Sequence, residues 1–193
     1  MSDLVSISPG NTKTGRIPAI SLRPVADCGN CRHCARDCYA LKAWQQYPVT
    51  REAWGRNSEL ARTARDSYFD QVGAYLERKH PEYFRWHIAG DILDQDYFNR
   101  MARVARANPE TRFLVFTKMH SLNYRRRPDN LTVVLSMWPG APRGRARLPR
   151  AWVQDGFEAR VPDTAISCPG NCETCGMCWQ LPKLQRDVVF KIH

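Results

Sequence analysis

The sequence predicts an α/β fold in which parallel strands form an open or incomplete barrel, with cysteine-rich loops near both ends of the chain. Three observations support this prediction: a strand–helix–strand pattern within residues 83–137, short apolar runs typical of parallel sheets covered on both faces, and eight cysteines gathered in residues 28–38 and 168–178. The 193 residues, 43% of them hydrophobic, fit a single domain over residues 1–193.

The first half of the chain predicts a strand, a long helix and a second strand. Residues 17–22 form a short apolar run that leads into the first cysteine group. Residues 50–79 predict one helix, because apolar residues recur at three- and four-residue steps until His80-Pro81 ends the pattern. Residues 83–89 predict the next strand, in which His87 is expected to be a structural histidine.

A crossover helix and two buried strands follow. Asp94 is expected to cap a helix that Asn108-Pro109 closes, and residues 113–117 and 131–137 read as buried strands. Residues 83–137 therefore predict a βαβ core with parallel pairing and a right-handed crossover. Weaker strand candidates are residues 157–161, 165–166 and 188–192.

Polar residues stand where three successive strands end. Asp91, Lys118 and Ser136 occupy these positions, which in parallel α/β folds face the functional edge of the sheet. Each of them could instead be a helix cap or a structural hydrogen-bonding group. Their recurrence on successive strands makes them the candidate catalytic residues.

The hydrophobic pattern of the chain indicates its cellular compartment and whether it has a membrane partner. No apolar run approaches the ~20 residues of a membrane span, and residues 1–14 lack a signal-peptide pattern, which predicts a cytoplasmic protein with no membrane partner. Thiols stay reduced in that compartment, so clustered cysteines there indicate metal more often than disulfides.

The net charge of +10 is concentrated in two places, residues 125–127 and the arginines 143, 145, 147 and 150. Such basic loops can neutralise phosphates, which makes nucleic acid a candidate partner, although they can equally be a solvated surface. The sequence identifies no specific redox partner or macromolecular substrate.

The eight cysteines form two groups with mirrored spacing. The first runs C-x2-C-x2-C-x3-C and the second C-x3-C-x2-C-x2-C. The first group is Cys28, Cys31, Cys34 and Cys38, and the second is Cys168, Cys172, Cys175 and Cys178. Close spacing of this kind suits a cubane, whose irons are spread over several ångströms, and the first spacing matches the bacterial ferredoxin run. The spacing therefore predicts two iron–sulfur clusters, 4Fe-4S or 3Fe-4S.

Several alternatives stay open at this point. Each group could hold its own cluster, Cys38 and Cys168 could cross over between clusters, or a labile iron could leave a three-iron form. Zinc is a second metal to consider, although structural zinc more often takes two separated cysteine pairs. In either case, the metal could serve only to stabilise the fold.

Four short motifs carry a resemblance to a known family. They are Cys38-Tyr39-Ala40, Ala89-Gly90-Asp91, Phe116-Thr117-Lys118 and the run from Cys175 to Trp179. From about Ser8 to Trp179 the chain resembles an uncharacterised family of phage- and plasmid-encoded proteins, the gene-product-eighty-eight type, which is distantly similar to radical S-adenosylmethionine (SAM) enzymes. The resemblance implies a phage-encoded protein of the host cytoplasm with a partial TIM-like barrel and a cluster loop after the first strand.

The similarity to radical-SAM enzymes also implies SAM as a cofactor, with Gly90-Asp91 in the place of the acidic motif that holds its methionine part. Those enzymes bind their cluster through C-x3-C-x2-C and leave one iron open for SAM. Here the first group runs in the other order and has a fourth cysteine, so that a fully ligated cluster would leave no iron for SAM.

Three functions follow from these patterns. The first is an iron–sulfur protein in a redox or electron-transfer role. The second is a radical-SAM-like enzyme acting on nucleic acid or another macromolecule, with Asp91, Lys118 and Ser136 around the substrate. The third is a zinc-stabilised nucleic-acid-binding protein. The sequence does not decide whether the chain is an enzyme.

Overall fold

An eight-stranded sheet organises the chain in the computed structural model, which describes residues 4–29, 34–35, 38–138, 140–142, 148–154 and 161–191. The strand order is β1-β2-β3-β4-β5-β6-β8-β7, and every neighbouring pair is parallel except β1 and β2. The strands are β1 (Ile7–Ser8), β2 (Ala19–Ile20), β3 (Tyr83–Trp86), β4 (Arg112–Thr117), β5 (Leu131–Ser136), β6 (Arg150–Gln154), β7 (Ile166–Ser167) and β8 (Val188–Lys191). The helices are α1 (Tyr39–Gln46), α2 (Pro48–Thr63), α3 (Arg65–Lys79), α4 (Gln95–Ala107), α5 (Cys172–Cys175), the 3-10 helix η2 (Met177–Trp179) and α6 (Leu181–Leu184).

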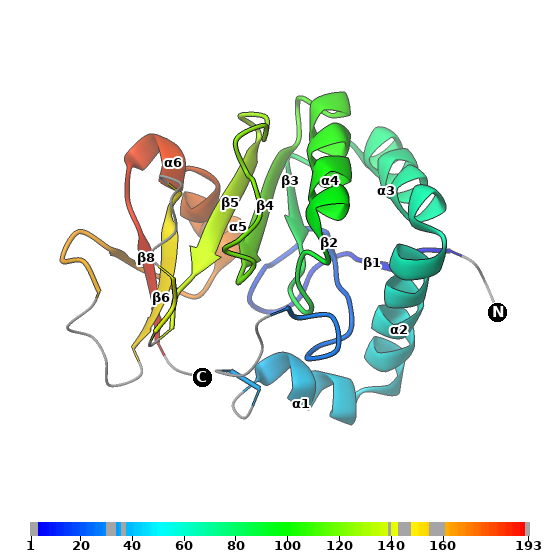
Figure 1. The fold of residues 1–193 in the computed structure, drawn as a ribbon, viewed down its shortest axis with the longest axis horizontal. Coiled ribbons are helices and arrows are strands. Elements are labelled where there is room, and N and C mark those ends of the chain that lie inside the picture. The colour runs from blue at the N-terminus through cyan, green and yellow to red at the C-terminus, as the bar shows by residue number, and fades with distance from the viewer. Residues whose placement is uncertain are drawn as a thin grey trace.

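The predicted α/β class and parallel core are confirmed. Strands β3 and β4 pair in parallel with α4 between them in the chain, and β5 continues the sheet on the far side of β4. A TIM-like barrel is not shown, however. The sheet is open, with β1 at one edge and β7 at the other, and Figure 1 shows it as a twisted layer.

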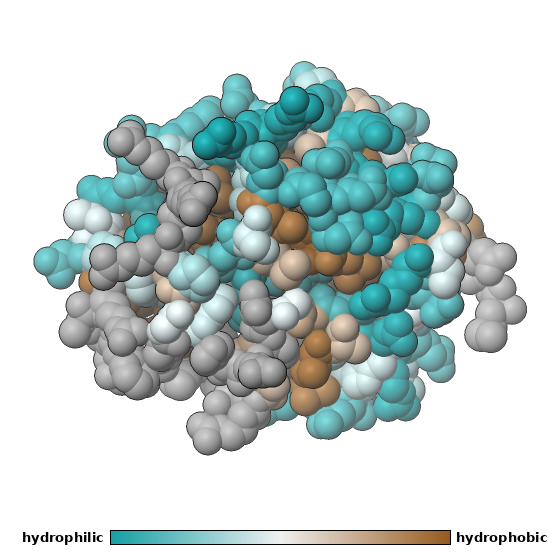
Figure 2. Space-filling model, in the orientation of Figure 1, coloured by the Kyte–Doolittle hydropathy of each residue, from teal (hydrophilic) through white to brown (hydrophobic). Residues whose placement is uncertain are grey.

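Helices cover one face of the sheet. The inward side chains of β3, β4 and β5 meet apolar residues of α2, α3 and α4, and together they make the larger of two cores. This core includes Leu60, Tyr68, Val72, Phe84, Trp86, Phe98, Met101, Phe113, Val115, Val133 and Leu135. In Figure 1 α4, α3 and α2 lie on the same side of the sheet, next to β3, and Figure 2 shows this side as mostly hydrophilic outside. The helices are thus amphipathic layers over the sheet.

The predicted continuous helix over residues 50–79 is wrong. Ala64 takes φ −137° and ψ 53°, which ends α2 and begins α3. The break is fully hydrogen-bonded, because the Ala64 amide donates to the Leu60 carbonyl and the Ala64 carbonyl accepts from the Tyr68 amide. The chain thereby changes direction, as Figure 1 shows, and both halves reach the curved face of the sheet.

Other elements differ from the predictions in extent. Strand β3 ends at Trp86 rather than at residue 89, because His87 adopts φ 56°. The predicted cap is confirmed, since the Asp94 carboxylate accepts from the Tyr97 amide at 2.8 Å. Helix α1 and strands β1 and β6 were not predicted. Of the weak candidates, residues 157–160 and residue 192 lie outside the described residues, whereas β7 and β8 form at the predicted ranges 165–166 and 188–192 with shifts of one residue.

The C-terminal segment covers the opposite face of the sheet. Side chains from β4, β5, β6 and β8 form a second core there with Trp179 and Leu181. Trp179 packs against Tyr83 with ring centroids 5.0 Å apart, and its carbonyl accepts from the Thr132 hydroxyl at 2.9 Å. The second cysteine group is thus fastened directly to the sheet. Within the described ranges no helix is long and apolar enough to cross a membrane.

Replacing Asn57 with alanine is expected to lower the free energy of unfolding by about 2–3 kcal/mol. This fully buried side chain accepts from the Ser6 amide at 2.7 Å and donates to the carbonyls of Ser6 and Ser21. Its removal leaves these backbone groups without their hydrogen-bond partner. Urea unfolding followed by circular dichroism measures the change. The matched substitution at exposed Asn99, also within a helix, should stay within about 0.5 kcal/mol of the native protein. Equal losses of stability in Asn57→Ala and Asn99→Ala would contradict a stabilising role for the hydrogen bonds of Asn57.

Candidate metal centres

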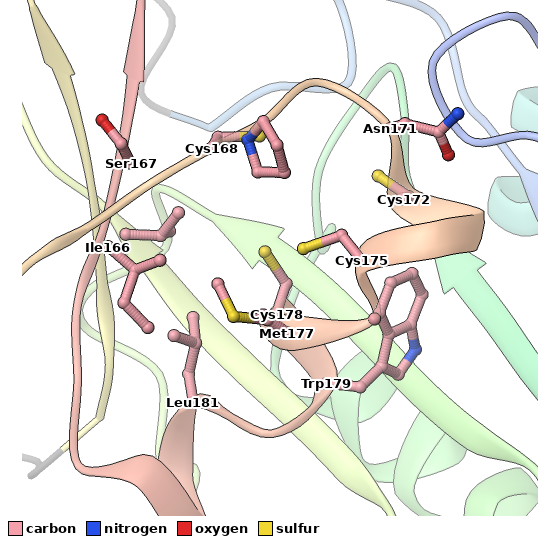
Figure 3. Close-up of a pocket in the computed structure, with 13 residues that line it drawn as sticks. Ile166, Ser167, Cys168, Asn171, Cys172, Cys175, Met177, Cys178, Trp179 and Leu181 are labelled. Carbon is pink, nitrogen blue, oxygen red and sulfur yellow. The ribbon is translucent and has the colours of Figure 1, made fainter.

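The second cysteine group lines one hollow. Cys168 follows β7, Cys172 and Cys175 begin and end α5, and Cys178 lies in η2. All four border one hollow that is partly open to solvent, with Ile166, Leu181 and Val188 among its other lining residues. Figure 3 shows the sulfur atoms of Cys172, Cys175 and Cys178 pointing into this space. We call this arrangement the C-terminal site.

Local backbone signals bring these thiols together. The Asn171 side chain caps α5 by accepting from the Thr174 amide at 3.2 Å. Gly176 ends the helix with φ 58°, a conformation that glycine adopts at little cost, and its amide donates to the Cys172 carbonyl. The single turn of α5 and the change of direction at Gly176 bring Cys172, Cys175 and Cys178 to the same hollow.

The C-terminal thiols are held in an apolar environment. Burial raises the pKa of Cys172, and it raises the pKa of Cys178 to about 12. The positive charge of Arg85 opposes this increase at both cysteines. Without metal, the Cys172 and Cys178 thiols therefore stay protonated at neutral pH, and metal binding through them must release protons.

The N-terminal segment forms one wall beside this site. The Cys172 amide donates to the Lys13 carbonyl at 2.9 Å. The Glu173 carboxylate accepts from the Arg16 amide at 3.1 Å and from its Nε at 2.7 Å. The chain near residue 15 approaches Glu173 so closely that a side chain on Gly15 would collide with it. Residues 13–16 thus fix α5 from outside.

The first cysteine group follows β2. Cys28, Cys34 and Cys38 are described and half-buried, whereas Cys31 lies outside the described residues. The seven described cysteines are free thiols. Buried Asp27 anchors this loop: its carboxylate pairs with Arg62 of α2, and its carbonyl accepts from the Asp91 amide at 2.8 Å. We call this arrangement the N-terminal site.

Asp91 and Lys118, two of the three candidate catalytic residues, lie together beside this loop. The Asp91 carboxylate accepts from the Lys118 amide at 2.8 Å, and Asp91 is buried. Burial lowers the pKa of Lys118, but the negative charges of Cys34, Asp91 and Cys28 outweigh burial and raise it above its usual range. The end of β4 therefore presents a cation to the first cysteine group.

Gly90 explains how Asp91 reaches this position. It takes φ 77°, and a Cβ on it would lie 2.6 Å from that of Leu22. Only glycine permits this approach, which aligns the Leu22 amide with the Ala89 carbonyl at 2.9 Å. The Ala-Gly-Asp motif thus has a structural reason in addition to its place at the site.

Ser136 and the basic residues do not join these sites among the described contacts. Ser136 ends β5, and its carbonyl lies 2.9 Å from His120 Nε2. Arg125 and Arg126 are exposed after β4, and Arg150 begins β6. Arg143, Arg145 and Arg147 lie outside the described residues. Nucleic-acid binding through these loops stays a prediction.

Comparison with known proteins identifies the family. The model of the family described as "Gene product 88" matches residues 6–181. The chain belongs to this family. A Gene 88 protein of Mycobacterium phage L5 is 28% identical, over 75% of this chain and 74% of the relative. No solved structure matches.

Membership in the Gene product 88 family confirms part of the resemblance predicted from the motifs. The matched range includes all eight cysteines, Asp91 and Lys118. These comparisons give no support to similarity with radical-SAM enzymes. The family description itself assigns no activity, so the chemistry must be argued from the residues.

Sequence reasoning missed three residues of these sites. Asp27 anchors the first loop, Tyr39 donates its hydroxyl to the Ile88 carbonyl beside it, and Arg85 lies on the sheet face near the C-terminal site. Arg85 had a signal in the sequence, because it is a cation in the otherwise aromatic Tyr83–Trp86 strand. Tyr39 belongs to the Cys38-Tyr39-Ala40 motif but had no assigned role, and Asp27 had no signal apart from its position next to Cys28.

The donors fit an iron–sulfur cluster in their chemistry. Thiolates are the ligands of such clusters, and buried Arg85 Nε has no hydrogen-bond partner among the described residues, as expected of a donor that awaits an anionic group. No three His, Cys, Asp or Glu side chains in the described part of the chain are placed to hold a single metal ion.

Proposed function

We propose that this chain is an iron–sulfur protein with two cubane-type clusters, 4Fe-4S in each site, and a redox or electron-transfer role. The observation that carries the proposal is the C-terminal site, where four thiols spaced C-x3-C-x2-C-x2-C line one hollow. A hollow bordered by sulfur suits a group larger than an ion, because each cysteine then binds a different corner.

The residues of each site have separable roles. Cys168, Cys172, Cys175 and Cys178 would hold one cluster, and Cys28, Cys31, Cys34 and Cys38 the other. Each cluster would accept and release one electron at a time. Around the C-terminal site, Trp179, Leu181 and Val188 limit the access of water, which influences the reduction potential of such groups.

The surrounding charges also suit anionic groups. Lys118 offers a cation to the N-terminal site, and Arg85 offers one to the C-terminal site. A thiolate-ligated cluster carries net negative charge, so nearby cations stabilise it, and more so in its reduced form. Since the relative is a phage protein, we assign this role to the host cytoplasm.

Metal and sulfide analysis tests the proposal. The protein is purified without oxygen, and iron, zinc and acid-labile sulfide are measured with visible and electron paramagnetic resonance spectra before and after dithionite. About eight irons and eight sulfides per chain are expected. A colourless protein with about two zincs and no sulfide would overturn the proposal and favour the zinc alternative.

A second candidate, a radical-SAM-like enzyme, is favoured by one observation: Asp91 and Lys118 lie at the strand ends beside Cys28 and Cys34. SAM would bring an amino and a carboxylate group, which an acidic and a basic residue could bind. Addition of SAM to the dithionite-reduced protein tests it. A changed electron paramagnetic resonance spectrum supports an iron that is open to SAM. An unchanged spectrum contradicts the radical-SAM-like candidate and favours the redox or electron-transfer role.

A further inference from the structure

Arg85 is a half-buried cation whose charge acts on residues of both cysteine sites. It lies in the middle of β3, where side chains alternate between the two faces of the sheet. Phe84 and Trp86 point into the helix-covered core, whereas Tyr83 packs with the second core. Arg85 shares the face of Tyr83, which is the face that carries the C-terminal cysteines.

The contacts of Arg85 confirm this placement. Its guanidinium lies over the Phe116 ring at 5.0 Å from the centroid, and Phe116 packs in the second core with Cys168, Cys172 and Cys178. This stacking holds the planar group in one orientation. The position is therefore set by aromatic packing and leaves the edge of the guanidinium available to another partner.

Arg85 also lacks a carboxylate partner in the described part of the chain. No ion pair to it is found there, and its buried Nε makes no hydrogen bond there. A buried N–H donor without an acceptor is unfavourable, so Arg85 Nε suits an anionic or sulfur acceptor. Its charge acts on Cys172 and Cys178 on one side and on Tyr39 of the N-terminal site on the other.

We propose that Arg85 is a positioning residue for the C-terminal cluster, donating a hydrogen bond from Nε to a cysteinyl or inorganic sulfur and raising the reduction potential of that cluster. This inference rests on the proposed function. Reduction adds one electron to an already anionic group, and a fixed cation stabilises the reduced form more than the oxidised form. The potential of the C-terminal cluster would then be higher with Arg85 present than without it.

Potentiometric titration of the anaerobic full-length protein tests the inference, with dithionite as the electron donor. The C-terminal cluster is the one whose signal disappears in Cys178→Ser. In Arg85→Gln, at the native midpoint potential of this cluster, the ratio of its reduced to its oxidised form should be about tenfold lower. The other cluster should change less. Arg112→Gln is the matched control, since exposed Arg112 also stacks on a ring, that of Tyr83, at 5.8 Å.

The outcomes separate this inference from the proposed function. A native protein without iron and sulfide overturns both. Full iron and sulfide in Arg85→Gln with an unchanged potential overturns only the role of Arg85. If Arg85→Gln loses its metal, Arg85→Lys provides the measurement, because it keeps the charge but not the planar donor. A potential of the C-terminal cluster below its native value in Arg85→Lys then supports the inference, and a native potential overturns it.

Discussion

Replacing Cys178 with serine is expected to remove about half of the metal, from about eight irons and eight sulfides per chain to about four of each. Cys178 lies in η2, where its side chain packs in the second core and borders the hollow of the C-terminal site. Serine is nearly isosteric but a poor ligand for iron, so the cluster should be lost with little change in packing. Anaerobic iron and sulfide analysis gives the result.

The control for this substitution is Met177→Leu, which changes a neighbouring lining residue that carries no thiol. It should keep full metal content, because leucine and methionine have similar volumes. Loss of all iron in Cys178→Ser would show that the two sites depend on each other. Full iron in Cys178→Ser would contradict its assignment as a ligand.

Acidification from pH 7.5 to pH 5 is expected to destabilise the folded chain by about 2 kcal/mol through His87 alone. Burial lowers the pKa of His87 from 6.5 to about 3, since the ring lies between Trp86 and Tyr97 and neither nitrogen has a hydrogen-bond partner among the described residues. Below pH 6.5 the unfolded chain binds a proton that the folded chain does not, so stability falls as the pH drops towards 3.

The variant His87→Phe tests this expectation, because it keeps an aromatic ring and cannot be protonated. Urea unfolding of both proteins at pH 7.5 and pH 5 measures the difference in their loss of stability. The variant should lose about 2 kcal/mol less than the native protein over this interval. Because His87 has φ 56°, His87→Asn serves as a second variant that suits this backbone. Parallel pH profiles for all three proteins would disprove the burial effect.

The parallel core could be predicted because its strands are apolar along their whole length. Residues 113–117 and 131–137 read as buried strands, and the structure places both in the middle of the sheet with core on each face. The break at Ala64 could not be predicted, because alanine favours helix and only the curved sheet requires the turn. Strand β6 was hidden by the adjoining stretch rich in proline and arginine.

The candidate sites, like the fold, could be predicted only in part from the sequence. Cysteine spacing predicted two groups, and the structure brings the second group to one hollow, while the metal itself stays a prediction. The strand-end rule brought Asp91 and Lys118 together correctly but not Ser136, which adjoins His120 instead. Arg85 was missed because its importance depends on which face of the sheet it occupies, and single-sequence patterns do not reveal what covers that face.

The order of strands at the sheet edge sets the time at which the C-terminal site can form. Strand β7 pairs only with β8, and the Cys168 amide donates to the Val189 carbonyl at 2.9 Å. Cys168 therefore has no fixed position until residues 188–191 have left the ribosome. The cysteines of the N-terminal site, by contrast, are synthesised before most of the strands. If the proposed function holds, cluster binding at the C-terminal site would therefore depend on β8 as well as on the four cysteines.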